Sequence, residues 1–236
     1  AMYQAKNDGR ARHAIFRAGM HDRVSSILKL ETELRQALSR DEFRLFYQPV
    51  VDVGSGRIVA FEALLRWQHP TRGLVSPDDF ISLAEETGLI CPIGIWGLAE
   101  ASRQLKAWHE RFGGERTLAM HANISPRQFA EPNLLEELRH VLTSTAVEPR
   151  ALILELTESA LLHDVSIARQ LIDEMRALGV RIVIDDFGMG YSSLAQLERF
   201  PVDGLKIDRS FTSRVGGSVK ATEIVRGIVN LARNVG

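Results

Sequence analysis

Residues 151–186 read ALILELTESALLHDVSIARQLIDEMRALGVRIVIDD. The apolar runs at 151–156 and 180–185 are typical of buried strands. Between them, apolar residues recur every three or four positions as far as Gly179, which predicts a helix that ends at this glycine. A strand, a helix and a strand in this order form a βαβ unit, whose two strands run parallel.

The same alternation continues on both sides of this unit. Four further apolar runs of strand length lie near 44–50, 58–66, 117–123 and 203–207, and helical patterns occur at 76–88, at about 92–112 and from about 218. Repeated units of this kind predict an α/β fold with a largely parallel sheet arranged as a barrel. One large domain suits a chain of 236 residues of which 45% are hydrophobic.

Polar side chains stand near the downstream end of each predicted strand. They are Gln48, Glu62, Asn123, Glu155, Asp185 with Asp186, and Lys206 with Asp208. Side chains alternate across a strand, so Glu62 and Arg66 share one face, and Glu155 and Asp185 turn toward the inside of the barrel. Barrel enzymes place their catalytic groups at the downstream ends of the strands. We therefore expect the fold to gather these residues into one site.

The carboxylates of Glu62, Glu155, Asp185 and Asp186 would repel one another in a single pocket unless some are protonated or cations lie among them. With Asn123 as a neutral oxygen donor, this all-oxygen set predicts two Mg²⁺ or Mn²⁺ ions rather than zinc. Two such ions roughly 3.5–4 Å apart are a common device for the attack of water on a phosphodiester.

Two basic residues extend this hypothesis. Lys206, facing two cations, would have its ammonium form disfavoured and become a candidate base. Arg66 presents the planar guanidinium that grips a phosphate. Simpler interpretations stay open: Lys206 could belong to a buried ion pair, and Asp185 with Asp186 could cap a helix. We expect His121 to face inward as a hydrogen-bonded residue of a barrel layer rather than as a ligand.

Composition and motifs argue against several classes of protein. The net charge of -1 argues against duplex nucleic acid as a partner. Cys91 is the single cysteine and no apolar run reaches membrane-spanning length, so we expect a cytoplasmic protein, or the cytosolic part of a membrane-anchored one. Asp186-Phe187-Gly188 resembles a kinase metal motif, but the kinase Gly-rich and catalytic loops are absent.

The segment Glu62-Ala63-Leu64, followed by Leu65-Arg66, resembles the signature of EAL-domain cyclic-di-GMP phosphodiesterases. Further segments resemble that family in its order and spacing: Tyr47-Gln48-Pro49, Asn123-Ile124-Ser125, Glu155-Leu156-Thr157-Glu158, Asp185-Asp186-Phe187-Gly188 with Gly190-Tyr191-Ser192-Ser193, and Leu205-Lys206-Ile207-Asp208. Together they extend over about residues 40–236.

The resemblance implies a TIM-like (β/α)8 barrel whose first strand runs antiparallel. It also implies two Mg²⁺ or Mn²⁺ ions, hydrolysis of cyclic di-GMP to linear pGpG, and a homodimer. It assigns the metal to Glu62, Asn123, Glu155, Asp185 and Asp186. It assigns water activation to Lys206, substrate contacts to Gln48, Arg66 and Asp208, and to Glu158 the steadying of the loop 187–193.

Two features depart from the family pattern. Met189 stands where the loop usually has a small residue, which bears on the packing of that loop. The chain ends at Gly236 with six predicted strands where a closed barrel needs eight, so we expect a barrel that is incomplete at its C-terminal end.

The opening Met2-Tyr3-Gln4-Ala5-Lys6 with Gly9-Arg10 resembles the tail of a GGDEF domain. We therefore expect a GGDEF-like tail at 1–16, a connector helix at 17–40 and the EAL phosphodiesterase domain at 41–236, with GGDEF or sensor domains upstream in the same polypeptide.

Three functions are consistent with acidic residues at the strand ends. The leading hypothesis is a metal-dependent cyclic-di-GMP phosphodiesterase. The alternative is an inactive EAL-type receptor that binds the dinucleotide without cleaving it; such receptors usually lose a metal ligand or the lysine. The third is an unrelated barrel enzyme that stabilises an enolate with Mg²⁺, and it predicts no affinity for a cyclic dinucleotide.

Overall fold

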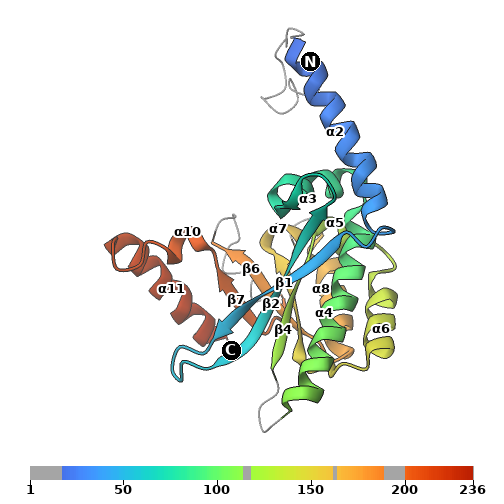
Figure 1. Cartoon of the computed structure of the whole chain (residues 1–236). Helices are drawn as coiled ribbons and strands as arrows, with labels where there is room; N and C mark the ends of the chain where they lie inside the picture. The colour runs from blue at the N-terminus through green and yellow to red at the C-terminus, as the bar shows by residue number, and fades with distance from the viewer. Residues whose placement is uncertain (1–17, 114–117, 162–163, 189–199, 236) are drawn as a thin grey trace. The chain divides into compact units, whose positions relative to one another are not determined.

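The computed structural model of the chain describes residues 18–113, 118–161, 164–188 and 200–235 (Figure 1). The expected GGDEF-like tail, Met189 and the segment Gly190-Tyr191-Ser192-Ser193 lie outside the described residues. The chain divides into two compact units.

The first unit combines Ala1–Phe43 with Trp67–Leu89. Its elements are α2 (Ala18–Ala37), β3 (Gly73–Val75), which pairs antiparallel with the end of β2, and α3 (Pro77–Thr87). Phe43, Trp67 and Phe80 are fully buried, with ring centroids 5.7–6.3 Å apart, and form an aromatic core. The strand β3 was not predicted, because three residues are too few to show a periodicity.

The second unit combines Arg44–Arg66 with Ile90–Gly236 and holds most of a sheet with the order β1-β2-β4-β5-β6-β7. The strands are β1 (Phe43–Val51), β2 (Ile58–His69), β4 (Ala119–Ile124), β5 (Leu152–Thr157), β6 (Arg181–Phe187) and β7 (Gly204–Ile207). All six lie where the sequence predicts them. From β2 onward, neighbours along this order pair in parallel.

The strands β1 and β2 are joined by residues 52–57, where Asp52 N donates to Arg57 O at 2.9 Å. A parallel crossover needs a dozen or more residues, so β1 runs antiparallel to β2. Within the described residues the sheet is open, with β1 and β7 at its two edges. The predicted α/β fold with an antiparallel first strand is confirmed, and the open sheet is consistent with an incomplete barrel.

Helices of the second unit cover the outer face of the sheet. Figure 1 shows α4 (Ile90–Phe112), α6 (Leu134–Thr145) and α8 (Val165–Ala177) grouped on one side of the strands. Against them β5 turns Leu152 and Leu154, both fully buried, and burial of each such side chain contributes about 1.5–3 kcal/mol. The remaining helices of this unit within the described residues are α5 (Pro126–Phe129), the 3₁₀ helix Pro149–Ala151, α7 (Glu158–Leu161), α10 (Arg209–Thr212) and α11 (Val219–Val235).

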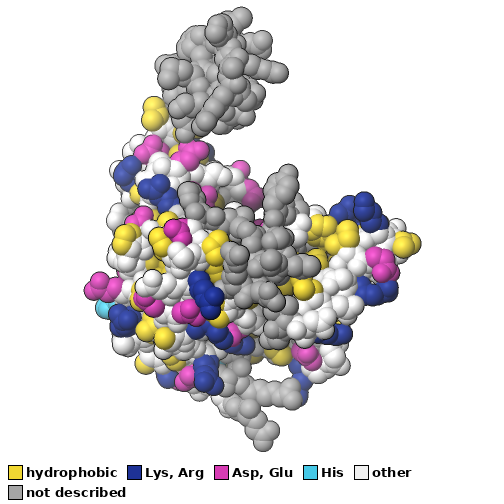
Figure 2. Space-filling model, turned by 180° about the vertical axis from the view of Figure 1, so that it is seen from behind, with side chains coloured by type: hydrophobic (Ala, Val, Ile, Leu, Met, Phe, Trp, Pro, Cys, Tyr) yellow, Lys and Arg dark blue, Asp and Glu magenta, His cyan; other side chains and the backbone are white. Residues whose placement is uncertain are grey.

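Surface charge agrees with the composition. On the face drawn in Figure 2, Lys and Arg side chains are interspersed with Asp and Glu side chains, so the described residues of this face form no continuous basic area for a duplex. In the part of the chain that the structure describes, no helix is both long and apolar enough to span a bilayer.

Candidate active site

The inner face of the sheet changes from apolar to polar along the strands. A small cluster of Ala60, Ala119 and Ile153, with Val183 packed against it, forms an apolar level on this face. Because side chains two positions apart point the same way, the next level downstream consists of other residues from the same four strands. They are Glu62, His121, Glu155 and Asp185. The inward orientation predicted for the three acids follows from this arrangement.

Lys206 on β7 connects three of these strands. Its Nζ donates to Glu62 Oε2 at 3.0 Å, to Glu155 Oε2 at 2.7 Å and to Asp185 Oδ2 at 3.1 Å. The Glu155 side chain is 1% exposed and that of Lys206 is 35% exposed. A carboxylate as deeply buried as Glu155 requires such a partner, because an unpaired buried charge is strongly destabilising.

The pKa of Lys206 reflects these contacts. Burial works against the charged ammonium, but the hydrogen bonds and charges of Glu155 and Glu62 outweigh it and raise the pKa above its ordinary value. This is opposite in direction to the shift that a lysine facing two cations would undergo. With these contacts intact, Lys206 is an ammonium at neutral pH.

The second oxygens of the two glutamates are also hydrogen-bonded. Asn123 Nδ2 donates to Glu62 Oε1 at 3.1 Å. His121 Nδ1 lies 2.7 Å from Glu155 Oε1. Each glutamate therefore uses one oxygen for Lys206 and the other for a side chain of β4, which holds the plane of both carboxylates.

A β-bulge accounts for the placement of two adjacent acids. Ile184 pairs with Leu205 and Phe187 pairs with Ile207, so two residues of β6, Asp185 and Asp186, oppose Lys206 alone. Simple alternation would turn Asp186 to the opposite face from Asp185. Asp186 adopts φ 54, a left-handed conformation that Asp tolerates better than most residues.

Asp186 lies among other acids. Burial, then the charges of Asp185 and Asp208, raise the pKa of Asp186, which shares a side-chain hydrogen bond with Asp208. Asp208 is also the N-cap of α10, where its Oδ1 accepts from Ser210 N at 2.7 Å. Hydrogen bonds from Ser210 hold the pKa of Asp208 below its usual range.

Glu158 lies at the start of α7 and is buried. Its Oε2 accepts from Gly188 N at 3.4 Å, directly after β6. The carboxylate therefore contacts the chain where the loop 187–193 begins, and the rest of that loop lies outside the described residues.

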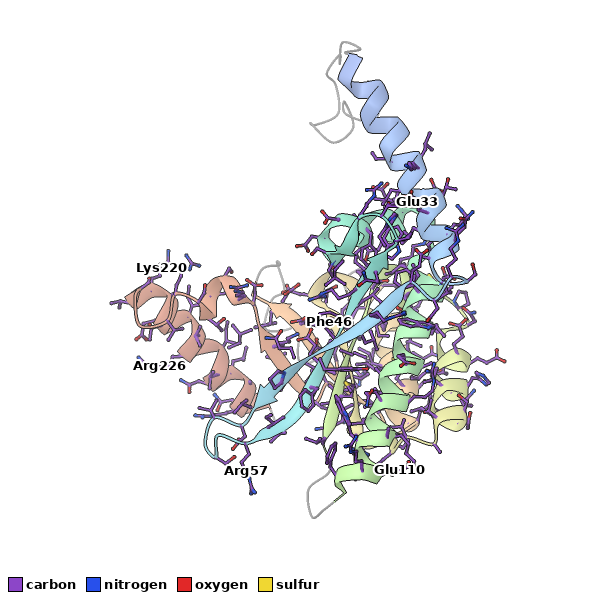
Figure 3. The ribbon with its side chains drawn as sticks, in the orientation of Figure 1. Glu33, Phe46, Arg57, Glu110, Lys220 and Arg226 are labelled. Carbon is purple, nitrogen blue, oxygen red and sulfur yellow. The ribbon has the colours of Figure 1, made fainter. Side chains whose placement is uncertain are left out.

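The expected substrate contacts lie apart from the Lys206 contacts. Gln48 is exposed on β1. The Arg66 guanidinium lies 5.6 Å from the ring centroid of Phe46, labelled on β1 in Figure 3, and its Nη1 donates to Leu65 O. In the described part of the chain, neither side chain hydrogen-bonds to Lys206 or to its three carboxylates.

The chemistry of the donor set fits a divalent cation. Three carboxylates face one ammonium, which leaves an excess of negative charge. Rotation of the Asn123 side-chain amide would turn its oxygen to the same site as a neutral ligand. Each of these carboxylates directs one oxygen to Lys206 Nζ, so the ammonium is the cation that they share in this structure. Accordingly, no three His, Cys, Asp or Glu side chains within 18–113, 118–161, 164–188 and 200–235 are arranged so that they could hold a metal ion.

Parallel strands whose downstream ends bring acids and a lysine together define a barrel protein with an acidic, cation-attracting site. A model of the EAL domain family matches residues 31–236, and the chain belongs to this family.

Two curated relatives are similar to this chain over nearly all of its length. It is 43% identical over 235 residues to the bifunctional diguanylate cyclase/cyclic di-GMP phosphodiesterase MucR of Pseudomonas aeruginosa, covering 100% of this chain and 34% of MucR. It is 40% identical over 233 residues to the cyclic di-GMP phosphodiesterase PdeR of Escherichia coli, covering 99% of this chain and 35% of PdeR. The chain thus spans about a third of the length of these relatives.

A solved structure of the PaMucR phosphodiesterase in complex with c-di-GMP has the same fold. It matches with a TM-score of 0.83 and 43% identity, covering 88% of this chain and 83% of that one. The FimX EAL domain from Pseudomonas aeruginosa bound to c-di-GMP matches with a TM-score of 0.74 and 27% identity, covering 84% of this chain and 78% of that one.

Proposed function

We propose that this chain hydrolyses cyclic di-GMP to linear pGpG at the inner face of the sheet, in bacterial signalling. The observation that carries the proposal is the convergence of Glu62, Glu155 and Asp185 on Lys206. The names of MucR and PdeR, and the c-di-GMP complex of PaMucR, support the same substrate and reaction. An inactive receptor is less well supported, because the acids and the lysine are all present.

Phosphodiesterases of this family depend in general on divalent metal ions. Two Mg²⁺ or Mn²⁺ ions would be held here by Glu62, Asn123, Glu155, Asp185 and Asp186. When bound, such ions supply positive charge to the phosphate oxygens, where negative charge builds up during hydrolysis. The excess of negative charge around Lys206 supports this assignment.

Lys206 is the proposed proton carrier. Hydrolysis joins a water oxygen to phosphorus and releases the ester oxygen, so one proton leaves the water and one reaches the leaving alkoxide. The carboxylate contacts that keep Lys206 charged are the same groups proposed to bind metal. When those carboxylates are engaged elsewhere, the pKa of Lys206 falls, and its Nζ can accept the proton from water.

The other assigned residues act around this centre. Arg66 would pair its guanidinium with a phosphate of the dinucleotide, and Gln48 and Asp208 would contact the remaining polar groups. Glu158 would hold the start of the loop 187–193 through Gly188. These roles follow from the family resemblance, and the contact with Gly188 supports that of Glu158.

The test is chromatography of cyclic di-GMP incubated with the protein and Mg²⁺ or Mn²⁺, with EDTA as the control. We expect metal-dependent pGpG from the wild type and from Lys220→Ala, a control lysine exposed on α11 (Figure 3), and at least about 100-fold less from Lys206→Ala. Tight binding of cyclic di-GMP without product from the wild type would identify a receptor. Neither binding nor product would overturn the proposal.

We further propose the division into a GGDEF-like tail at 1–16, a connector helix at 17–40 and the EAL domain at 41–236, within a longer polypeptide. MucR, which matches over the whole of this chain, is named as a bifunctional cyclase and phosphodiesterase, which supports an upstream GGDEF domain. We also propose a homodimer, for which light scattering coupled to size-exclusion chromatography is the direct measurement.

A further inference from the structure

His121 is a polar residue of the inner face to which the proposed reaction assigns no role. It lies on β4, two positions after Ala119 of the apolar level, and pairs in register with Ile153 of β5, two positions before Glu155. Its side chain is 15% exposed. Most of the imidazole is therefore removed from water, and its nitrogens need partners within the protein.

Glu155 supplies one partner at close range. The distance between His121 Nδ1 and Glu155 Oε1 is 2.7 Å, typical of a charge-assisted hydrogen bond. Because an ionised carboxylate only accepts, the hydrogen must lie on Nδ1, and His121 donates it. The other oxygen of Glu155 is held by Lys206 Nζ, also at 2.7 Å.

We infer that His121 is a positioning residue, which fixes the carboxylate of Glu155 so that Oε2 is presented to the centre of the site. A glutamate has three side-chain torsions, and a contact at one oxygen leaves its plane free to rotate. Contacts at both oxygens fix that plane. This inference rests on the proposed function, because Glu155 is a proposed metal ligand and His121 is the hydrogen-bonded partner that would orient it.

The competing interpretation is that His121 only fills space in a barrel layer. Filling alone does not require a hydrogen bond to Glu155. It also predicts that any side chain of similar volume serves equally well. Substitutions that separate the volume of His121 from the position of its donor nitrogen distinguish the two interpretations.

The test uses His121→Asn, His121→Gln and His121→Ala. The amide nitrogen of Asn lies close to the position of Nδ1, whereas that of Gln lies close to Nε2, so only Asn preserves the donor. We expect Asn to retain Mn²⁺ affinity, measured by electron paramagnetic resonance of free Mn²⁺. Gln and Ala should weaken it about 10- to 100-fold, the range found for lost partners of metal ligands. The turnover number should fall in parallel, while KM for cyclic di-GMP changes little.

His109→Asn is the matched control, because the amide nitrogen of Asn lies close to Nδ1 and does not reach the position of Nε2. His109 Nε2 lies 2.7 Å from Leu118 O, immediately before β4, so this histidine also has a structural hydrogen bond but lies away from the carboxylates. We expect its loss to lower the melting temperature and to leave Mn²⁺ affinity unchanged. Wild-type Mn²⁺ affinity in a folded His121→Ala, or equal losses in Asn and Gln, would overturn the inference.

A second measurement is independent of metal binding and of turnover. In long-range ¹H–¹⁵N spectra of the metal-free protein, His121 should carry its hydrogen on Nδ1, and the Nδ1–H proton should move upfield in Glu155→Gln. A hydrogen on Nε2 alone would overturn the inference. If the wild type neither binds Mn²⁺ nor hydrolyses the dinucleotide, the proposed function fails, and these spectra still decide whether His121 holds Glu155.

Discussion

The two units each contain a charged cluster, and the clusters differ in their ratio of charges. In the first unit, one acid faces three basic groups: Glu33 Oε2 lies 3.2 Å from His69 Nε2 and 3.3 Å from Arg72 Nη2, and Glu33 Oε1 lies 3.9 Å from Lys29 Nζ. In the second, three carboxylates face the one ammonium of Lys206. The first cluster has no excess negative charge that would attract a cation, whereas the second does.

The geometry around the basic groups differs as well. His69 Nδ1 accepts from Thr71 N at 3.2 Å and from Arg72 N at 3.3 Å, so its role within the turn after β2 is structural. His69 Nε2 is close to Glu33 but not aligned for a hydrogen bond. Lys206, in contrast, makes a hydrogen bond to each of its carboxylates. The Glu33 cluster, which is structural, thus differs from the Lys206 cluster, the candidate catalytic group, in its charge balance and its hydrogen-bond geometry, and not in burial alone.

The largest expected effect is on turnover. Lys206→Ala removes the central ammonium, and we expect hydrolysis of cyclic di-GMP to fall by about 10²- to 10⁴-fold, with binding of the dinucleotide retained. Glu62→Ala should abolish turnover too, and exposed Glu110→Ala (Figure 3) is its matched control. Product measured by chromatography at wild-type rates in either site variant would remove that residue from the mechanism.

Binding of Mn²⁺ should raise the stability of the folded protein through the Lys206 cluster and not through the Glu33 cluster. Because ions would bind only the folded site, Mn²⁺ at 100 times its dissociation constant should raise the free energy of unfolding by about 2.7 kcal/mol. Denaturant titrations with Mn²⁺ and with EDTA measure this gain. Asp185→Asn should lose most of it and Glu33→Gln should keep it; a gain of equal size in both variants would show that Mn²⁺ acts elsewhere.

Glu33→Gln tests the cluster in the first unit. Removing the acid that faces buried His69 and Arg72 should lower the free energy of unfolding by about 1–2 kcal/mol, measured in urea. Turnover and Mn²⁺ affinity should stay at wild-type values, because Glu33 (Figure 3) belongs to α2 and to no part of the proposed site. A loss of Mn²⁺ affinity would contradict the structural role given to this cluster.

The smallest effect is expected at the bulge. Asp186→Asn removes a charge that opposes Asp185 and Asp208 but keeps a residue that tolerates φ 54. In EDTA we expect stability to rise by a few tenths to about 1 kcal/mol, while Mn²⁺ affinity falls. Unchanged metal affinity would remove Asp186 from the proposed ligands.

Much of the fold was predictable, because it depends on local periodicity. All six predicted strands are present, and the two-residue alternation placed Glu62, Glu155 and Asp185 on the inner face. The helix α6 was not predicted, although Leu134 and Leu138 recur at helical spacing and are buried. Its signal was therefore present in the sequence.

The contacts of the site were harder to predict. The partner of His121 could not be known, because an inward orientation does not say which side chain of the neighbouring strand lies within 2.7 Å. The β-bulge places Asp185 and Asp186 of β6 opposite Lys206 of β7. A bulge arises from the pairing of two strands, so the sequence of β6 alone does not show it.

The sequence by itself determined the alternation of strands and helices, the face on which Glu62, Glu155 and Asp185 lie, and the membership of the EAL family, because these depend on spacing along the chain. The tertiary structure decided which residues meet. Lys206 reaches carboxylates 21, 51 and 144 positions away, and its pKa is raised by those contacts. The physical reason is that contacts across a sheet depend on the register between strands, which is set by packing of the whole unit rather than by any one strand.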